Sequence, residues 1–232
     1  MADLKIVILK GLQDYIPLLH MQHRLVSARR KGALETDVAL ILEHTPVFTL
    51  GRHAGRENLK VSENFLKQQG IQVVRAERGG DITYHGPGQV VAYLIVDLRS
   101  AHLRIPDFIA RLEEAMIRTA ADLGVKATRD PRNPGVWTGN RKLGSIGIAV
   151  RHGISYHGLA LNVSLSLEPF SWIHPCGLTG TTMTSLKEVG GHDIEMKVVK
   201  AALAGHLSDL FAGYNEAPEG RNKPIGDTIQ HL

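Results

Sequence analysis

Apolar and polar positions along the chain divide it into short strands interleaved with a few longer helices. Residues 38–43 and 90–98 are almost continuously apolar, and runs of that length are typical of strands buried on both faces. Residues 106–123 instead place Phe108 and Leu112 on one apolar stripe at helical spacing. That stripe, which also contains Ile109, Met116, Ala120 and Leu123, predicts core packing and no functional role.

The rest of the pattern predicts further elements on both sides of these three. Strands are expected at 5–10, 46–50, 72–75, 142–150 and 154–163, and helices at 62–69, at 193–211 and from a cap at Asp14 to 31. The last helix is expected to turn Ile194, Val198, Ala202 and Leu210 inward. Residues 77–89 are rich in glycine and are expected to form a loop.

Helices and strands do not alternate strictly along the chain. A strict alternation would indicate a doubly wound parallel sheet, whereas this irregular order favours the α+β class, with a mixed β-sheet flanked by helices. We expect a single domain over 1–213 and a polar, loosely ordered C-terminal tail over 214–232.

Composition and charge narrow the classes of function. The 232 residues are 43% hydrophobic and 22% charged, which is ordinary for a globular protein. The net charge of +4 suits an acidic partner, although a mildly basic solvated surface would also carry it. Aromatic residues make up only 5%, which argues against stacking on nucleic-acid bases. No apolar run approaches the roughly 20 residues that span a bilayer. With no signal sequence and one cysteine, we expect a cytoplasmic protein without membrane contact.

Cys176 is the only cysteine in the chain. It can form neither an intramolecular disulfide nor a thiolate metal cluster, so it is either a buried spectator or a reactive thiol. Pro175 fixes the backbone before the thiol, and Gly177 allows a substrate to approach closely. These flanks favour chemistry, but the residue alone leaves both interpretations open.

A glycine-rich segment over 78–89 is the clearest candidate for ligand binding. Its glycines expose backbone N–H groups and let the backbone touch a ligand, although an ordinary long turn would have the same composition. A strand is expected after it, which does not match a dinucleotide-binding fingerprint. His85 within it could be a functional or a structural histidine.

Lys142 opens a predicted strand in which residues of the same face are small or apolar. Alternation places it with Gly144, Ile146 and Ile148. Desolvation there would favour a neutral amine that can act as a base, whereas a charged amine would stabilise a nearby thiolate. The alternative is an edge lysine whose head reaches water.

Small residues recur in a later strand, over 156–163, and indicate a close neighbour, either another strand or a ligand. His157 in this strand is more typical of a structural residue than of a catalytic one. The histidines show no HExxH pair or other compact ligand spacing, so we expect no metal site.

Taken together, these segments resemble the lipoyl(octanoyl) transferases. The resemblance covers about 35–190 and rests on 42–52, 78–89, 142–147, 156–163 and the triplet Pro175, Cys176 and Gly177. The order of the glycine-rich segment, the lysine strand and the triplet is highly specific. Two departures, at Thr45 and Leu94, where the family often has proline, lie away from the proposed chemistry.

The resemblance implies a fold similar to biotin and lipoate protein ligase catalytic domains. It implies transfer of an octanoyl group from acyl carrier protein to a lysine of lipoyl domains, in 2-oxoacid dehydrogenase complexes and the glycine cleavage H protein, with no cofactor. Cys176 matches the acyl-thioester nucleophile and Lys142 the residue that activates it. The substrate-binding residues carried over are Arg78, Gly79, Gly80, Asp81, Ile82, Thr83, Tyr84, His85, Ser145, Ile146, Gly147, Gly158, Leu159 and Ala160.

Three other functions stay open at this point. An ATP-dependent lipoate-type ligase would have a similar fold, but its chemistry needs no thiol. A variant transferase would exchange octanoyl groups between lipoyl-domain proteins. The third is a binding module without catalysis, which the presence of both reactive residues disfavours.

Overall fold

The structure, a computed structural model, describes residues 4–52, 54–130, 133–173 and 182–212. Cys176 and the predicted tail over 214–232 lie outside these residues.

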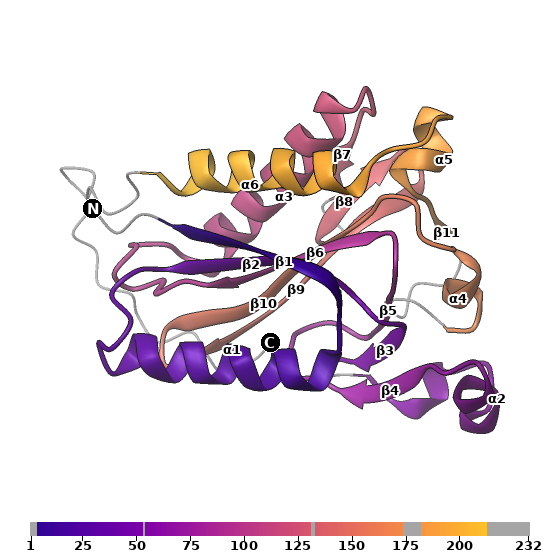
Figure 1. Cartoon of the computed structure of the whole chain (residues 1–232), viewed down its shortest axis with the longest axis horizontal. Helices are drawn as coiled ribbons and strands as arrows, with labels where there is room; N and C mark the ends of the chain where they lie inside the picture. The colour runs from indigo at the N-terminus through magenta and orange to yellow at the C-terminus, as the bar shows by residue number, and fades with distance from the viewer. Residues whose placement is uncertain (1–3, 53, 131–132, 174–181, 213–232) are drawn as a thin grey trace.

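A mixed eight-stranded sheet forms the centre of the molecule (Figure 1). Its strands run in the order β1 (Lys5–Gln13), β2 (Val38–His44), β6 (Gln89–Ile95), β10 (Ile154–Asn162), β9 (Arg141–Arg151), β8 (Gly135–Thr138) and β7 (Thr128–Arg129), and β11 (Thr182–Met183) pairs with the start of β9. β1 is parallel to β2, β11 is parallel to β9, and the other pairs are antiparallel. The predicted mixed sheet of the α+β class is therefore confirmed.

Helices cover both faces of this sheet. α1 (Tyr15–Arg30) lies on one face, and α3 (Ile105–Asp122) and α6 (Met196–Phe211) lie together on the other (Figure 1). Both faces of β2 are therefore buried. Ile41 packs in the core beneath α3 and α6, whereas Leu40 and Leu42 pack in the core beneath α1. A strand buried on both faces has no polar face to show, which explains its continuous apolar run.

A second, three-stranded sheet stands beside the first in the order β4 (Gln72–Arg75), β3 (Val47–Leu50) and β5 (Ile82–His85). It packs with α2 (Glu63–Gln68) and α4 (Glu168–Ser171) around its own apolar core. The expectation of a loop throughout 77–89 is wrong in part, because β5 lies inside that segment. Its pairing with β3 satisfies backbone groups that the local sequence could not match to a partner.

The predicted inner face of the last helix is wrong in part, although Ile194 and Leu210 do pack against the core as expected. Val198 is 50% exposed, whereas Val199, Leu203 and Leu207 are fully buried. These buried residues repeat every fourth position, so the row that faces the sheet begins one residue later than expected. Two short elements, η1 (Arg56–Asn58) and α5 (Leu186–Gly190), complete the fold.

Candidate active site

A cavity of about 300 Å³ opens where the glycine-rich segment crosses β9 and β10. All the predicted substrate-binding residues except Tyr84 line it, and so does Lys142. Tyr84 lies instead in the core of the small sheet, where its ring packs against Phe48 and Phe170. Segments more than sixty residues apart in sequence thus meet around one space.

The wall of the cavity depends on a free stretch of strand edge. The pairing of β8 with β9 ends at Ser145, and beyond it the Gly79 N–H donates to the Ile148 carbonyl at 2.8 Å. A Cβ on Gly147 would stand 2.9 Å from Cδ of Arg78. Glycine at 147 is what lets the crossing segment lie this close to the strand.

Arg78 anchors the crossing segment to the small sheet. Its side chain is buried, and its guanidinium donates to the Thr49 carbonyl at 2.7 Å and to Oγ1 of Thr49 at 2.8 Å. It also donates to the carbonyl of Gly79 at 3.1 Å. Charge-assisted bonds of this kind hold a loop in one conformation.

Lys142 is only 2% exposed, so the alternative of an edge lysine that reaches water is wrong. Its Nζ donates to Oδ1 of Asn133 and lies 5.3 Å from the centre of the Trp137 ring. The Trp137 indole in turn donates to the Asn133 carbonyl at 3.4 Å. Lys142 is therefore a buried amine whose position is set by β8 and the residues before it.

The chain returns to Lys142 after the segment that holds Cys176. Cys176 itself lies outside the described residues. Thr182–Met183 pairs with Arg141–Lys142, and the Thr184 N–H donates to the Lys142 carbonyl at 2.9 Å. The described chain six positions after the cysteine is thus hydrogen-bonded to the lysine strand.

A buried chain of hydrogen bonds runs from His85 to Thr184, the residue that is hydrogen-bonded to Lys142. Nδ1 of His85 donates to Oε1 of Gln89 at 2.7 Å, and Nε2 of Gln89 donates to Oδ1 of Asn162 at 2.9 Å. Nδ2 of Asn162 then donates to the Thr184 carbonyl at 2.9 Å. Burial lowers the pKa of His85 to about 3, so the imidazole is neutral at physiological pH. His85 has the contacts of a structural histidine at the cavity wall.

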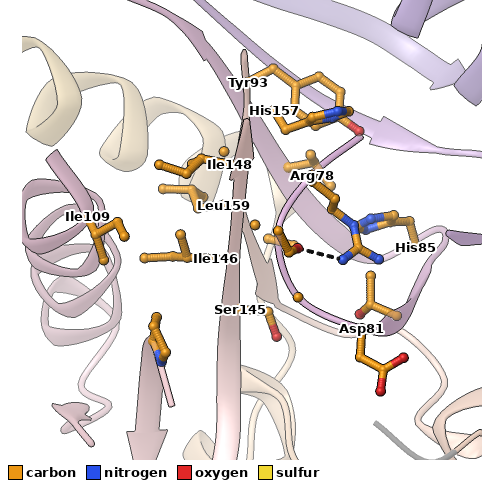
Figure 2. A pocket seen from close by; sticks show the side chains of 18 of the residues that line it. Arg78, Asp81, His85, Tyr93, Ile109, Ser145, Ile146, Ile148, His157 and Leu159 are labelled. Carbon is orange, nitrogen blue, oxygen red and sulfur yellow. Dashed lines mark hydrogen bonds between the residues drawn. The ribbon is translucent and has the colours of Figure 1, made fainter. Parts of the chain in front are cut away.

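The two sides of β9 and β10 differ in character within the cavity. Figure 2 shows Ile146, Ile148 and Leu159 on one side together with Ile109 of α3. Arg78, Asp81, His85 and Ser145 lie on the other side. The cavity therefore offers both an apolar wall and a polar one.

Sequence reasoning missed several lining residues, among them Tyr15, Tyr93, Ile109, Asn133 and His157. Ile109 was expected to have only a core role, yet it lines the cavity from α3. No local pattern distinguishes these positions, because they come from separate elements that only the tertiary fold brings together.

Metal and membrane features can be assessed for the residues that the structure describes. Among them no three His, Cys, Asp or Glu side chains are grouped as a metal site would require. Within the same ranges, no helix combines the length and hydropathy needed to cross a membrane.

Comparisons with known proteins agree on one family. Residues 14–208 match the family model of the lipoyl protein ligase A/B catalytic domain. The octanoyltransferase of Desulfotalea psychrophila is 50% identical over 206 residues, covering 88% of this chain and 92% of that protein.

Solved structures show the same fold at low sequence identity. Lipoate-protein ligase A bound with ATP has a TM-score of 0.68 at 18% identity, covering 90% of this chain and 85% of that one. The biotin protein ligase of Aquifex aeolicus in complex with biotin and ATP has a TM-score of 0.56 at 12% identity, covering 91% and 72%. The expected similarity to these ligase folds is confirmed.

Proposed function

Because this chain belongs to the lipoyl protein ligase A/B catalytic domain family and is a transferase, we propose that it moves an octanoyl group from acyl carrier protein to a lysine of a lipoyl domain. The proposed intermediate is a thioester on Cys176. The observation that carries this proposal is the buried Lys142 amine, held by Asn133 at a cavity with an apolar wall.

In the first step Cys176 attacks the donor. A free thiol has a pKa of about 8.5, so little of it is thiolate at neutral pH without help. Lys142 takes the thiol proton, Sγ forms a bond to the thioester carbonyl carbon, and the carrier leaves as its own thiol with a proton returned from Lys142. The pairing of β11 with the start of β9 supports this partnership, since it ties the chain downstream of Cys176 to Lys142.

In the second step the acceptor lysine attacks the Cys176 thioester. Its neutral amine forms the amide bond, Lys142 accepts the released proton, and the cysteine leaves as thiolate and is reprotonated. A thioester-to-amide transfer is downhill, so the reaction needs no nucleotide.

Both steps pass through an oxyanion that needs a preorganised donor. Gly147 and Gly158 line the cavity, but they pair with each other across β9 and β10. The Ile148 carbonyl instead lies on the edge of β9 that faces away from β10, where it accepts from the Gly79 N–H. Alternation along the strand therefore turns the Ile146 N–H to the same open edge, and we choose it as the candidate donor.

The apolar wall suits the octanoyl chain. Ile109, Ile146, Ile148 and Leu159 would cover its methylene groups. Each buried methylene contributes about 0.8 kcal/mol, so the chain would contribute several kcal/mol of binding.

A basic depression beside the cavity suits an acidic carrier. Arg52, Arg75 and Arg151 line a second open hollow of about 480 Å³, and all three are exposed. Glu77 lies among them, where its carboxylate accepts a hydrogen bond from the Tyr156 hydroxyl. A patch of this charge would steer an acidic protein toward the cavity mouth.

The decisive test is incubation of the protein with octanoyl-acyl carrier protein and a lipoyl domain, without ATP. Intact mass should show an octanoyl adduct on the enzyme and then on the acceptor lysine. The Cys176→Ser variant should form no enzyme adduct at the wild-type level. An acceptor that is modified only when ATP and free octanoate are supplied would instead indicate a ligase.

A donor comparison tests the closest alternative. Octanoylated H protein should be a poorer donor than octanoyl-acyl carrier protein, and the Arg75→Glu variant should raise the KM for the carrier with little change in kcat. A higher rate with the H protein would favour exchange between lipoyl-domain proteins.

A further inference from the structure

The chain over 133–137 lies directly against the side chain of Lys142. β8 begins in this segment, and a Cβ on Gly135 would stand 3.1 Å from Cε of Lys142 and 2.3 Å from the carbonyl oxygen of Gly144. Gly135 also has a φ of +132°, a conformation that residues with side chains rarely adopt. Glycine at 135 is therefore what allows the 133–137 segment to lie this close to the lysine.

Helix α3 fixes the same segment from its other side. Glu113 of α3 is buried, and its Oε1 accepts from the Gly135 N–H at 3.0 Å. Its Oε2 accepts from Nε of Arg129 at 3.2 Å. Hydrogen bonds to a charged carboxylate are stronger than neutral ones, so the start of β8 is held by α3 as well as by its pairing with β9.

Asn133 and Trp137 bring this rigid segment into contact with the amine. Oδ1 of Asn133 accepts a hydrogen bond from Nζ of Lys142, and the centre of the Trp137 ring lies 5.3 Å from the same atom. The Trp137 indole donates to the Asn133 carbonyl at 3.4 Å. Asn133 thus holds the amine and is itself held by Trp137, and it lines the cavity beside Lys142.

A neutral amide suits an amine that gains and loses a proton. The amide oxygen can accept from Nζ whether the amine is neutral or charged, so it can fix the direction of the amine in both forms. A carboxylate at the same place would also accept from Nζ, but it would favour the charged form. Asparagine therefore supplies position without changing the charge of the site.

We propose that Asn133 is a positioning residue for the transfer reaction, which holds the Lys142 amine in one direction in the cavity and thereby sets the rate at which Cys176 is acylated. This inference rests on the proposed function, because it takes Lys142 as the proton acceptor in that reaction. Displacement of a reacting group by about 1 Å can slow a reaction about 100-fold, so a contact that fixes the amine has a measurable effect.

Asn133→Ala removes the acceptor. Asn133 is only partly buried, so we expect the variant to keep its fold by circular dichroism and its urea unfolding midpoint. Single-turnover acylation by octanoyl-acyl carrier protein should be about 10- to 100-fold slower than in the wild type at every pH tested. The KM for the carrier should change little, because the amide contacts Lys142 and lies apart from the basic depression.

Asn133→Asp keeps an oxygen in the same place and adds a negative charge. The amine should stay in position but remain charged to higher pH, so acylation should be slow at neutral pH and recover toward the wild-type rate in alkaline buffer. The midpoint of the pH–rate profile should rise by about one unit or more. The ¹⁵N NMR signal of Nζ, assigned with the Lys142→Met variant, should titrate with the same shift.

Asn140→Asp is the matched control. It places the same charge two residues before Lys142, but in an exposed turn where solvent and salt screen it. Both the pH–rate profile and the Nζ titration should therefore stay as in the wild type.

The outcomes separate positioning from a merely structural contact. Equal losses in Asn133→Ala and Asn133→Asp at all pH values would overturn the inference, and so would a wild-type acylation rate in Asn133→Ala. An Nζ signal that titrates in Asn133→Asp as it does in the wild type would also overturn it. Absence of ATP-free transfer by the wild type would overturn the proposed function, and the Nζ titration would still decide whether Asn133 holds the amine.

Discussion

Acid should destabilise this protein well before its carboxylates are protonated, because three histidines are buried as neutral rings. Burial lowers the pKa of His44 to about 4 and those of His85 and His157 to about 3. The His44 contacts fit a neutral ring, since Nδ1 donates to the Gln13 carbonyl at 2.8 Å and Nε2 accepts from the Tyr93 hydroxyl at 2.7 Å.

The sign and size of the effect follow from proton binding. In the unfolded chain each histidine has a pKa near 6.5, so below that value the unfolded state binds up to three protons that the folded state does not. Stability is therefore fully present above pH 6.5 and falls as the pH is lowered toward the folded pKa values. Each proton that only the unfolded state binds lowers the free energy of unfolding by about 1.4 kcal/mol per pH unit. Summed over the three histidines, the free energy of unfolding falls by about 5 kcal/mol between pH 7 and pH 5.

Urea unfolding between pH 7 and pH 5, followed by tryptophan fluorescence, measures this loss. His157→Asn should reduce the pH dependence by about a third, since one of the three histidines is removed. His20→Gln, at an exposed position of α1, should leave it unchanged. A free energy of unfolding that changes by less than about 1 kcal/mol over this range would refute the reasoning.

Four further predictions concern single substitutions. Gly147→Ala should cost about 1–3 kcal/mol of stability and raise the KM for the acyl donor, because its Cβ would press on the fixed Arg78 side chain at 2.9 Å. Gly205→Ala, in α6 with open space around its Cβ, should instead stabilise by about 0.5–1 kcal/mol, and equal unfolding midpoints for the two variants would contradict both. Asp37→Ala should lower the free energy of unfolding, measured by chemical denaturation, by about 3–5 kcal/mol. The Asp37 carboxylate is 1% exposed and lies 2.8 Å from Nε of Arg29, so its removal takes away the ion-pair partner of that guanidinium. Lys142→Met should keep the fold by circular dichroism, lose most octanoyl transfer and slow iodoacetamide alkylation of Cys176, whereas an unchanged alkylation profile across pH would exclude the activating role.

The elements most accurately predicted are those whose apolar pattern depends only on which of their faces are covered by the rest of the protein. Their prediction does not require the identity of the neighbouring strand or helix. β2 and α3 show this, since continuous apolar character marks a strand covered on both faces and a helical stripe marks contact with a sheet. β5 and β8 were missed because four residues of strand in a glycine-rich or polar setting look like loop until a neighbouring strand supplies their hydrogen bonds.

The sequence by itself determined the class of fold, the family, and the segments that carry the chemistry, because each depends on residue type and local order. Only the tertiary structure decided that Lys142 is buried against Asn133 and Trp137, that Ile109 serves the cavity as well as the core, and that His157 turns to the α1 face. Each of these features depends on elements that lie far apart in the chain. Burial of a polar group or a strained backbone costs free energy, and that cost is offset by residues that are close in space but that no local sequence pattern identifies. The cavity exists for the same reason, since β8 stops pairing with β9 at Ser145 and the glycine-rich segment takes over the open edge.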